Sequence, residues 1–178
     1  FRRAQRSIHS KATSCDWGVL MSLNREALFD ALFQRLVGIG GFMYSSRQFV
    51  TYDDVEASQQ PALIMTKGSE SVENMRGFPP KWTLNGTIYI YCRNDQDPNI
   101  SPSIQLNQLI TLVEAAFERT ATESAVANAP YMDSPSDYLT TLGGLCSHAW
   151  ITGTIQTDEG VLGQQAVALI PFEIVATG

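Results

Sequence analysis

Two segments of the chain repeat apolar residues every three or four positions, a pattern that predicts amphipathic helices. The first covers residues 24–37, which Ser22 or Asn24 can cap and which the glycine-rich "GIGGF" ends. Its apolar face carries Leu28, Leu32 and Leu36. The second covers residues 101–120, with Pro102 at the first helical position. Its apolar stripe consists of Leu106, Leu109, Ile110, Val113 and Phe117.

Alternation of apolar and polar residues predicts β-strands in the rest of the chain. Residues 81–92 alternate most regularly, and we expect their apolar face to lie against the helices. That face carries Trp82, Leu84, Gly86, Ile88, Ile90 and Cys92. Shorter strands are predicted at residues 42–50 and 61–67. The C-terminal part predicts a hairpin, with strands at residues 145–156 and 163–176 joined by the turn "TDEG".

The order of these elements is helix, strands, helix and hairpin, which predicts an α+β fold. We expect a mostly antiparallel β-sheet with the two main helices packed on one face and a β-hairpin at the C-terminus. Residues 68–80, "GSESVENMRGFPP", are predicted to form a long connection, and connections of this length are often functional. Pro171 lies inside the last strand and predicts an edge position or a bulge there, because proline cannot donate a backbone hydrogen bond.

Charge divides the chain unevenly. Residues 1–20 carry four basic residues and one acid, whereas the remainder holds eight basic and seventeen acidic residues. We therefore predict a basic N-terminal arm or upstream extension at residues 1–20, and a single domain at residues 21–178. Met21 opens a segment that resembles an ordinary protein start. An acidic body repels phosphate and disfavours general nucleic-acid binding. No apolar run is long enough to predict a membrane span.

The residues that attract most attention chemically are Cys146 and His148, in "TLGGLCSHAWITGTI". We expect them to share one face of a strand. A zinc site needs about four converging ligands, and a Cys-His nucleophile needs hydrogen-bond contact and an orienting group. The sequence supplies neither, so we predict no catalytic, cofactor-binding or metal-binding residue and no enzyme activity. The adjacent glycines Gly143 and Gly144 predict a special turn or a close backbone approach.

Taken together, the predicted elements resemble the tail terminator family of long-tailed bacteriophages, also called tail completion or minor tail proteins of the gpU-like group. The resemblance covers about residues 22–176. It rests on the order and spacing of "REALFDALFQRL", "SSRQF", "QQPALIM", "NGTIYIYC", "LNQLITLVEAAF", "LGGLCSHAWITGTI" and "GQQAVALIPFEI".

The resemblance implies a structural virion protein, assembled in the host cytoplasm. Such proteins form a ring, usually a hexamer, at the head-proximal end of the tail tube. The ring stops tube polymerisation and offers an interface for head-tail joining proteins, while DNA passes through its lumen without specific binding. The implied partners are therefore further copies of this chain, the tail tube protein and the neck proteins. Candidate interface residues are Met75, Arg76 and Phe78 in the long connection, and Asp158 and Glu159 in the predicted turn.

Other functions remain open at this point. The first alternative is another phage neck or head-tail joining protein of similar size. The others are a small intracellular enzyme with an unrecognised site and a monomeric binding module.

Overall fold

The computed structural model describes residues 23–93, 102–123, 139–159 and 165–178. The predicted arm at residues 1–20 lies outside these residues, as do Ser22 and most of the segment between the second helix and Gly143. The helices and strands are α1 (Arg25–Gly38), β1 (Tyr44–Ser46), β2 (Ala62–Glu73), β3 (Lys81–Arg93), α2 (Pro102–Ala116), β4 (His148–Ile151), β5 (Gln156–Glu159) and β6 (Gln165–Thr177). Two short 3-10 turns, Tyr52–Asp54 and Ala57–Gln59, lie between β1 and β2.

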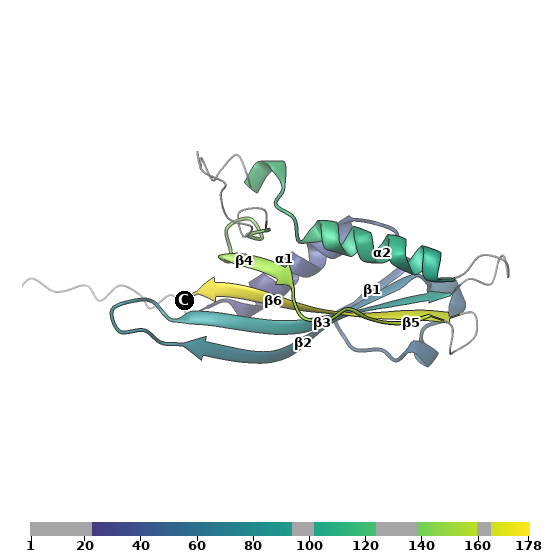
Figure 1. Ribbon diagram of the computed structural model, residues 1–178, viewed down its shortest axis with the longest axis horizontal. Helices are drawn as coiled ribbons and strands as arrows, with labels where there is room; N and C mark the ends of the chain where they lie inside the picture. The colour runs from purple at the N-terminus through teal and green to yellow at the C-terminus, as the bar shows by residue number, and fades with distance from the viewer. Residues whose placement is uncertain (1–22, 94–101, 124–138, 160–164) are drawn as a thin grey trace, which may run out of the picture.

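The strands form one six-stranded sheet in the order β1-β2-β3-β6-β4, and β5 also pairs with β6 (Figure 1). Among the strands of the described residues, β1 and β2 pair in parallel and the other pairs are antiparallel. The long strands β2, β3 and β6 form the centre, and β3 pairs with β6 from Lys81 opposite Thr177 to Arg93 opposite Gln165. The predicted α+β class, with a mostly antiparallel sheet and a paired C-terminal hairpin, is confirmed.

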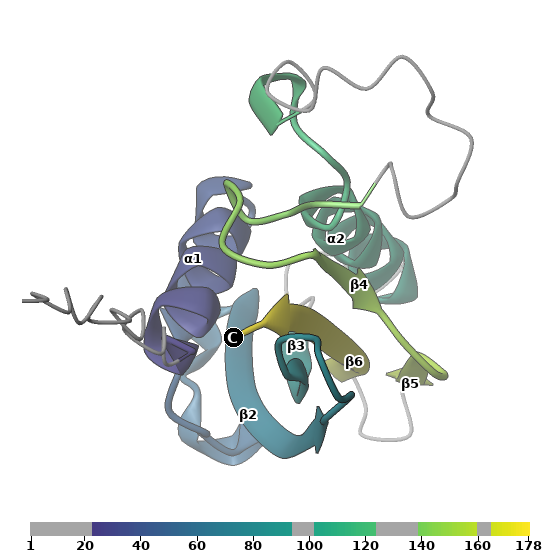
Figure 2. The ribbon, with the colours of Figure 1, turned by 90° about the vertical axis from the view of Figure 1, so that its left-hand side faces the viewer.

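Both helices lie on the same face of the sheet, which we call the covered face (Figure 2). The Asn24 side chain caps α1 by accepting a hydrogen bond of 3.1 Å from the backbone N–H of Ala27. After Gly38, Gly40 and Gly41 adopt φ angles of +79° and +85°, which glycine reaches most easily. The predicted cap and glycine-rich helix end are therefore confirmed.

The main core lies between the helices and the covered face. Leu84, Ile88 and Ile90 of β3 are fully buried there, as the alternation predicted. From the helices come Leu28, Phe29, Leu32, Leu36, Leu106, Leu109 and Val113. A smaller cluster on the opposite face joins Tyr91 and Ile64 to Val55, so the segment between β1 and β2 covers that end of the second face.

Two strands differ in extent from their predictions. The first strand is shorter, at Tyr44–Ser46 instead of residues 42–50. The second is longer, because β2 continues to Glu73 through a register shift between Lys67 and Glu70. The predicted connection at residues 68–80 is therefore wrong for residues 68–73. Except for Val72, these residues are polar or glycine and gave no apolar alternation, and backbone pairing with β3 decides their conformation.

The predicted strand at residues 145–156 is two strands, β4 and β5, separated at Thr152–Ile155. Thr157, Asp158 and Glu159 belong to β5, so the "TDEG" turn is wrong for these three residues, while Gly160 lies outside the described residues.

Pro171 is also placed differently from its prediction, because β6 is a central strand. The Pro171 carbonyl accepts a hydrogen bond of 2.9 Å from the Thr152 N–H, so this side of the residue faces the interruption between β4 and β5. In an antiparallel strand the N–H and C=O of one residue point to the same side. The side of Pro171 that lacks an N–H therefore faces the interruption between β4 and β5, where no strand needs this hydrogen-bond donor.

Candidate functional site

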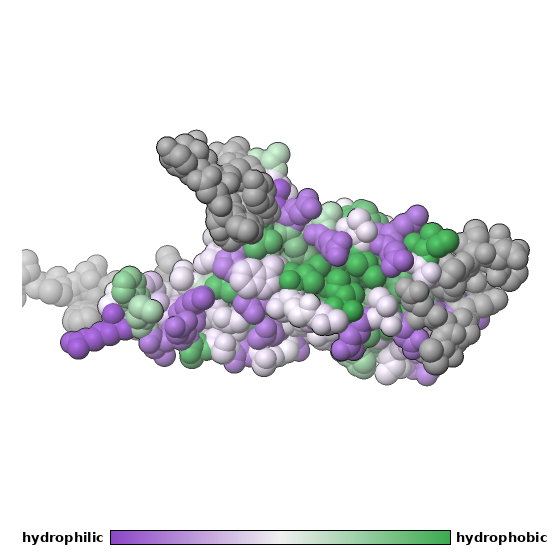
Figure 3. Space-filling model, viewed as in Figure 1, coloured by the Kyte–Doolittle hydropathy of each residue, from purple (hydrophilic) through white to green (hydrophobic). Residues whose placement is uncertain are grey.

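The hairpin formed by β2 and β3 ends in a protruding turn at residues 74–80 (Figure 1). Phe78 is 68% exposed and Met75 is 57% exposed, and Arg76 between them is also exposed. The Phe78 N–H donates to the Met75 carbonyl at 3.0 Å, and Gly77 has a φ of +87°. Figure 3 shows hydrophobic side chains at this end of the hairpin among hydrophilic ones. The predicted interface residues Met75, Arg76 and Phe78 are thus neighbours on one exposed turn.

The first turn of α1 holds the base of this hairpin. Arg25 Nε donates to Glu70 Oε2 at 2.6 Å, and the Arg25 guanidinium lies 4.4 Å from the centre of the Trp82 ring. Lys67 Nζ lies 2.7 Å from Glu26 Oε2. These pairs are at the surface, where each one stabilises the fold only modestly. Together they restrict how far the hairpin can swing relative to α1.

Glu26 also accepts a hydrogen bond of 2.5 Å from Arg47 Nη1. Hydrogen bonds from Arg47 and then Lys67 lower the pKa of Glu26 to about 2. Arg47, which falls in the predicted strand at residues 42–50, lies just after the end of β1 at Ser46, so its contact with Glu26 joins β1 to α1.

Asp158 and Glu159 lie at the opposite end of the sheet from the hairpin turn. They pair with Val167 and Ala166 of β6, near the end of β3 marked by Arg93. At about 3.3 Å per residue, β3 separates the two ends of the sheet by about 40 Å. The structure therefore does not bring all five predicted interface residues together.

Cys146 and His148 do not share a strand face, because β4 begins at His148 and Cys146 belongs to the preceding loop. Burial, followed by the negative charge of Glu123, raises the pKa of the Cys146 thiol to about 12. His148 stacks on Trp150 with ring centres 4.3 Å apart, and burial followed by the Lys81 charge lowers the His148 pKa. Among the residues that the structure describes, no group of three or more His, Cys, Asp or Glu side chains is placed to hold a metal ion.

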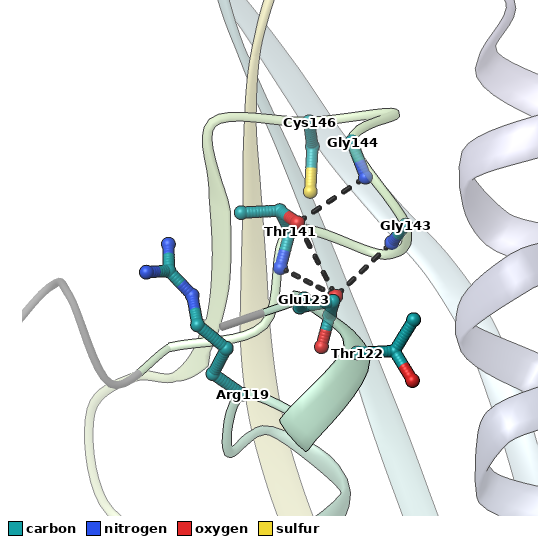
Figure 4. Close-up of a pocket in the computed structure, with 7 residues that line it drawn as sticks. All are labelled: Arg119, Thr122, Glu123, Thr141, Gly143, Gly144 and Cys146. Atoms are coloured by element: carbon teal, nitrogen blue, oxygen red, sulfur yellow. Dashed lines mark hydrogen bonds between the residues drawn. The ribbon is translucent and has the colours of Figure 1, made fainter. Parts of the chain in front are cut away.

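A polar cluster that the sequence did not predict lies above β4, centred on the carboxylate of Glu123 (Figure 4). Backbone N–H groups of Thr120, Thr141 and Gly143 donate to this carboxylate at 2.8, 3.0 and 3.0 Å. Arg35 Nη1 of α1 forms an ion pair with it at 3.0 Å. Backbone N–H groups that converge in this way form an anion-binding nest, and here the anion is a side chain of the same chain.

The backbone of the loop creates this geometry. Leu142, Gly143 and Gly144 have φ angles of 51°, 73° and 90°. Glycine reaches such positive φ angles most easily, which explains why two glycines occur here. The Gly143 N–H donates to Glu123, whereas the N–H groups of Leu142 and Gly144 donate to the hydroxyls of Thr140 and Thr141. The predicted special turn at the glycine pair is confirmed, and its function is to receive the Glu123 carboxylate.

The electrostatics of the cluster keep Glu123 ionised. Its side chain is 7% exposed, and this burial opposes ionisation. Hydrogen bonds from Thr120, Gly143, Arg35 and Thr140 favour the ionised form, and together they outweigh burial. They hold the pKa of Glu123 well below its usual range. Arg35 also donates to Thr140 Oγ1 at 2.7 Å and to the Glu118 carbonyl. The cluster therefore joins α1, the segment after α2 and the loop before β4.

A cavity of about 290 Å³ adjoins the cluster (Figure 4). Its lining residues are Arg119, Thr122, Glu123, Thr141, Gly143, Gly144 and Cys146. The Glu123 carboxylate is occupied by internal hydrogen bonds, and the raised pKa keeps Cys146 a thiol. These two groups are suited to holding the loop in place and are poorly suited to acting as a base and a nucleophile.

No helix among the described residues is long and apolar enough to span a membrane. No family model matches the chain, and no curated protein matches it. Among solved structures, the chain is similar to a chain from the "Virion of native gene transfer agent (GTA) particle", with 11% sequence identity and a TM-score of 0.46. The alignment covers 86% of this chain and 96% of that one. A TM-score this low transfers neither fold nor function to this chain.

Proposed function

We propose that the protein is a structural component of a phage virion, a tail terminator that forms a closed homomeric ring on the head-proximal end of the tail tube. The ring, which we expect to be a hexamer, ends tube polymerisation and offers a surface for head-tail joining proteins. The proposal rests on the family resemblance of residues 22–176 and on the element order, from α1 through the central strands and α2 to the C-terminal hairpin.

The observation that carries the assembly part of the proposal is the exposed apolar turn of the β2–β3 hairpin. Met75 and Phe78 are held away from the core of their own molecule, because the strands that carry them are paired and tied to α1. An ordered apolar turn loses less conformational entropy on docking than a flexible one. We therefore place a subunit or tube contact at Met75, Arg76 and Phe78.

The charge of the body is consistent with a DNA conduit. The chain has a formal net charge of −6, and a wall of this sign lets DNA pass without binding it. Asp158 and Glu159 are the second candidate contact, at the other end of the sheet. Two distant contacts are compatible with a ring, since a ring joins one patch of each subunit to a different patch of the next.

The test is electron microscopy of tails assembled with wild-type protein and with a Met75→Ser/Phe78→Ser double variant. We expect normal tails with wild-type protein, and overlong tubes or tails without heads with the variant. A control is Thr87→Ser, a conservative change in the middle of β3, opposite Thr66 and away from the turn. If this protein, labelled for microscopy, is found on the head side of the head-tail joint and not at the tube end, the result would instead favour a neck or head-tail joining protein. Tails of normal length that join heads, assembled without any of this protein, would refute the proposal.

A further inference from the structure

The cavity beside Glu123 contains a positive charge that the polar cluster does not use. Arg119 lines this cavity and is half-buried. Its Nε atom is buried and has no hydrogen-bond acceptor within the protein. The ion pairs among the described residues use other basic side chains, those of Arg25, Arg35, Arg47 and Lys67. Arg119 therefore carries a charge for which the described part of the chain supplies no partner.

The nearby Glu123 carboxylate does not fill this role, although it lines the same cavity. One of its oxygens accepts from Arg35 and the Thr120 N–H, and the other accepts from the Thr141 and Gly143 N–H groups. A buried donor without an acceptor costs free energy, and buried polar side chains in folded proteins are rarely left in that state. The Arg119 guanidinium is thus available to an anion that enters the cavity.

The charges around the cavity define the anion that fits. Glu123 is offset by its ion pair with Arg35. Arg119 and Glu123 are the charged residues of the lining, because burial and then the Glu123 charge raise the pKa of the Cys146 thiol to about 12. One negative charge therefore balances the site, whereas a phosphate dianion would leave an uncompensated charge in a partly buried place. A carboxylate carries one charge, and its two oxygens match the parallel N–H donors of a guanidinium, Nε–H included.

The size and lining of the cavity suit a carboxylate on a short carbon chain. Its volume is about 290 Å³, whereas one water molecule takes up about 30 Å³ in the liquid. Arg119 and Thr122 lie on opposite sides of Glu123, and the Cys146 side chain points from the loop toward Thr141 (Figure 4). The neutral thiol and the threonine methyl groups offer apolar surface to the carbon chain of a ligand.

We propose that this cavity is a carboxylate-binding site, in which the Arg119 guanidinium holds the carboxylate and the side chains of Thr141 and Cys146 contact its carbon chain. A free carboxylic acid and an Asp or Glu side chain of another protein present the same group. The site lies within one copy of the chain, so it does not depend on the ring proposed above.

The first test uses sodium acetate as the probe and sodium chloride at the same ionic strength as the reference. In ¹⁵N-labelled protein, we expect the Arg119 Nε–H and Gly144 N–H signals to shift with acetate and to saturate with a Kd of about 1–10 mM. In Arg119→Met, the Gly144 signal should not respond to acetate. Arg76→Gln, which removes the same charge from the hairpin turn, should respond as wild type does.

Melting temperatures separate binding from a structural role of Arg119. Arg119→Met removes no bond within the described residues, so in chloride we expect a melting temperature equal to or above that of wild type. Acetate at about ten times its Kd should raise the melting temperature of wild type by about 2–5 °C and leave Arg119→Met unchanged.

Three results would overturn the proposal. Equal effects of acetate and chloride would show that the cavity holds water only. Tighter binding of dimethyl phosphate, a singly charged phosphodiester, would exclude a carboxylate as the preferred anion. An Arg119→Met protein that melts well below wild type in chloride would show that Arg119 has a partner within its own chain.

Assembly identifies the source of the carboxylate once acetate binds. If a neighbouring subunit supplies it, Arg119→Met and excess acetate should each weaken association at least tenfold in analytical ultracentrifugation. If a free acid supplies it, association should be unchanged and assembled protein should bind acetate. Wild-type protein that never associates would refute the ring, while the acetate titration would still decide the site.

Discussion

Replacing Glu123 by glutamine tests whether the polar cluster above β4 holds the fold together. The substitution keeps the size of the side chain but removes its charge and turns one oxygen into an amide nitrogen. Because Arg35 and the Thr120 N–H contact one oxygen, and the Thr141 and Gly143 N–H groups contact the other, either orientation of the amide places N–H groups against N–H groups.

The cost follows from the number of donors left without an acceptor. An unpaired buried donor costs about 1–3 kcal/mol, and breaking one side of a buried ion pair costs about 3–5 kcal/mol. Part of the cluster is near the surface, and Arg35 keeps its bonds to Thr140 and to the Glu118 carbonyl. We therefore expect a loss of about 2–4 kcal/mol. In a chain of this length, that lowers the melting temperature by about 5–15 °C.

Thermal unfolding followed by circular dichroism is the assay, with Glu118→Gln as the control because Glu118 is exposed and lies in the same segment. The pKa of Glu123 is lowered in the folded state, so its contribution is fully present above the unfolded pKa of about 4.3 and is lost as the pH falls through the folded value. The difference between wild type and Glu123→Gln should therefore shrink as the pH falls from about 5 to about 3. A Glu123→Gln protein with the same melting temperature as wild type at neutral pH would show that the polar cluster does not stabilise the fold.

Three further predictions concern packing and the cysteine. Gly86→Ala should lower the free energy of unfolding, measured with denaturant, by about 1–3 kcal/mol. The added methyl group would lie 2.3 Å from Phe172 Cζ and 2.6 Å from the Thr66 carbonyl oxygen, and unchanged stability would contradict this packing. Ile88→Asp should lose several kcal/mol and accumulate as insoluble protein, because Ile88 is fully buried; a soluble, normally folded variant would contradict its placement. The Cys146 thiol should react with iodoacetamide at pH 8 at least tenfold more slowly in folded than in urea-unfolded protein, measured by mass spectrometry, since its pKa is raised to about 12; equal rates would exclude burial.

Local patterns predicted the elements whose side chains are divided between core and solvent. Strand β3 alternates along its length, and its apolar face lies against the helices as expected. The start and end of α1 were also predictable, because Asn24 and the following glycines act through neighbouring backbone groups. In both cases the signal and its cause lie within a few residues of each other.

The remaining features depend on partners that are distant in the sequence. Glu123 is 88 residues from Arg35, and the sequence gives no sign that they meet. The interruption between β4 and β5 includes Gly153 with a φ of +70°, beside Pro171 of β6. Proline alone indicated a site where no backbone donor was needed. The sequence could not show which neighbouring strand would be interrupted beside Pro171. That depends on the strand order, and local alternation does not determine strand order.

The long β2–β3 hairpin combines polar strand positions with an apolar turn, and folding explains only part of this arrangement. Residues 67–73 of β2 are all exposed, so extending this strand adds little to the core. Pairing with β3 supports it, and β6 continues beside β3 as far as Lys81 opposite Thr177. A hairpin that served folding alone would gain from a polar turn at its end, because exposed apolar side chains invite association. Phe78 and Met75 occupy that turn instead, while the strand behind them remains suited to water. This distribution is the one expected of an arm that keeps its length in solvent and buries its end against another subunit.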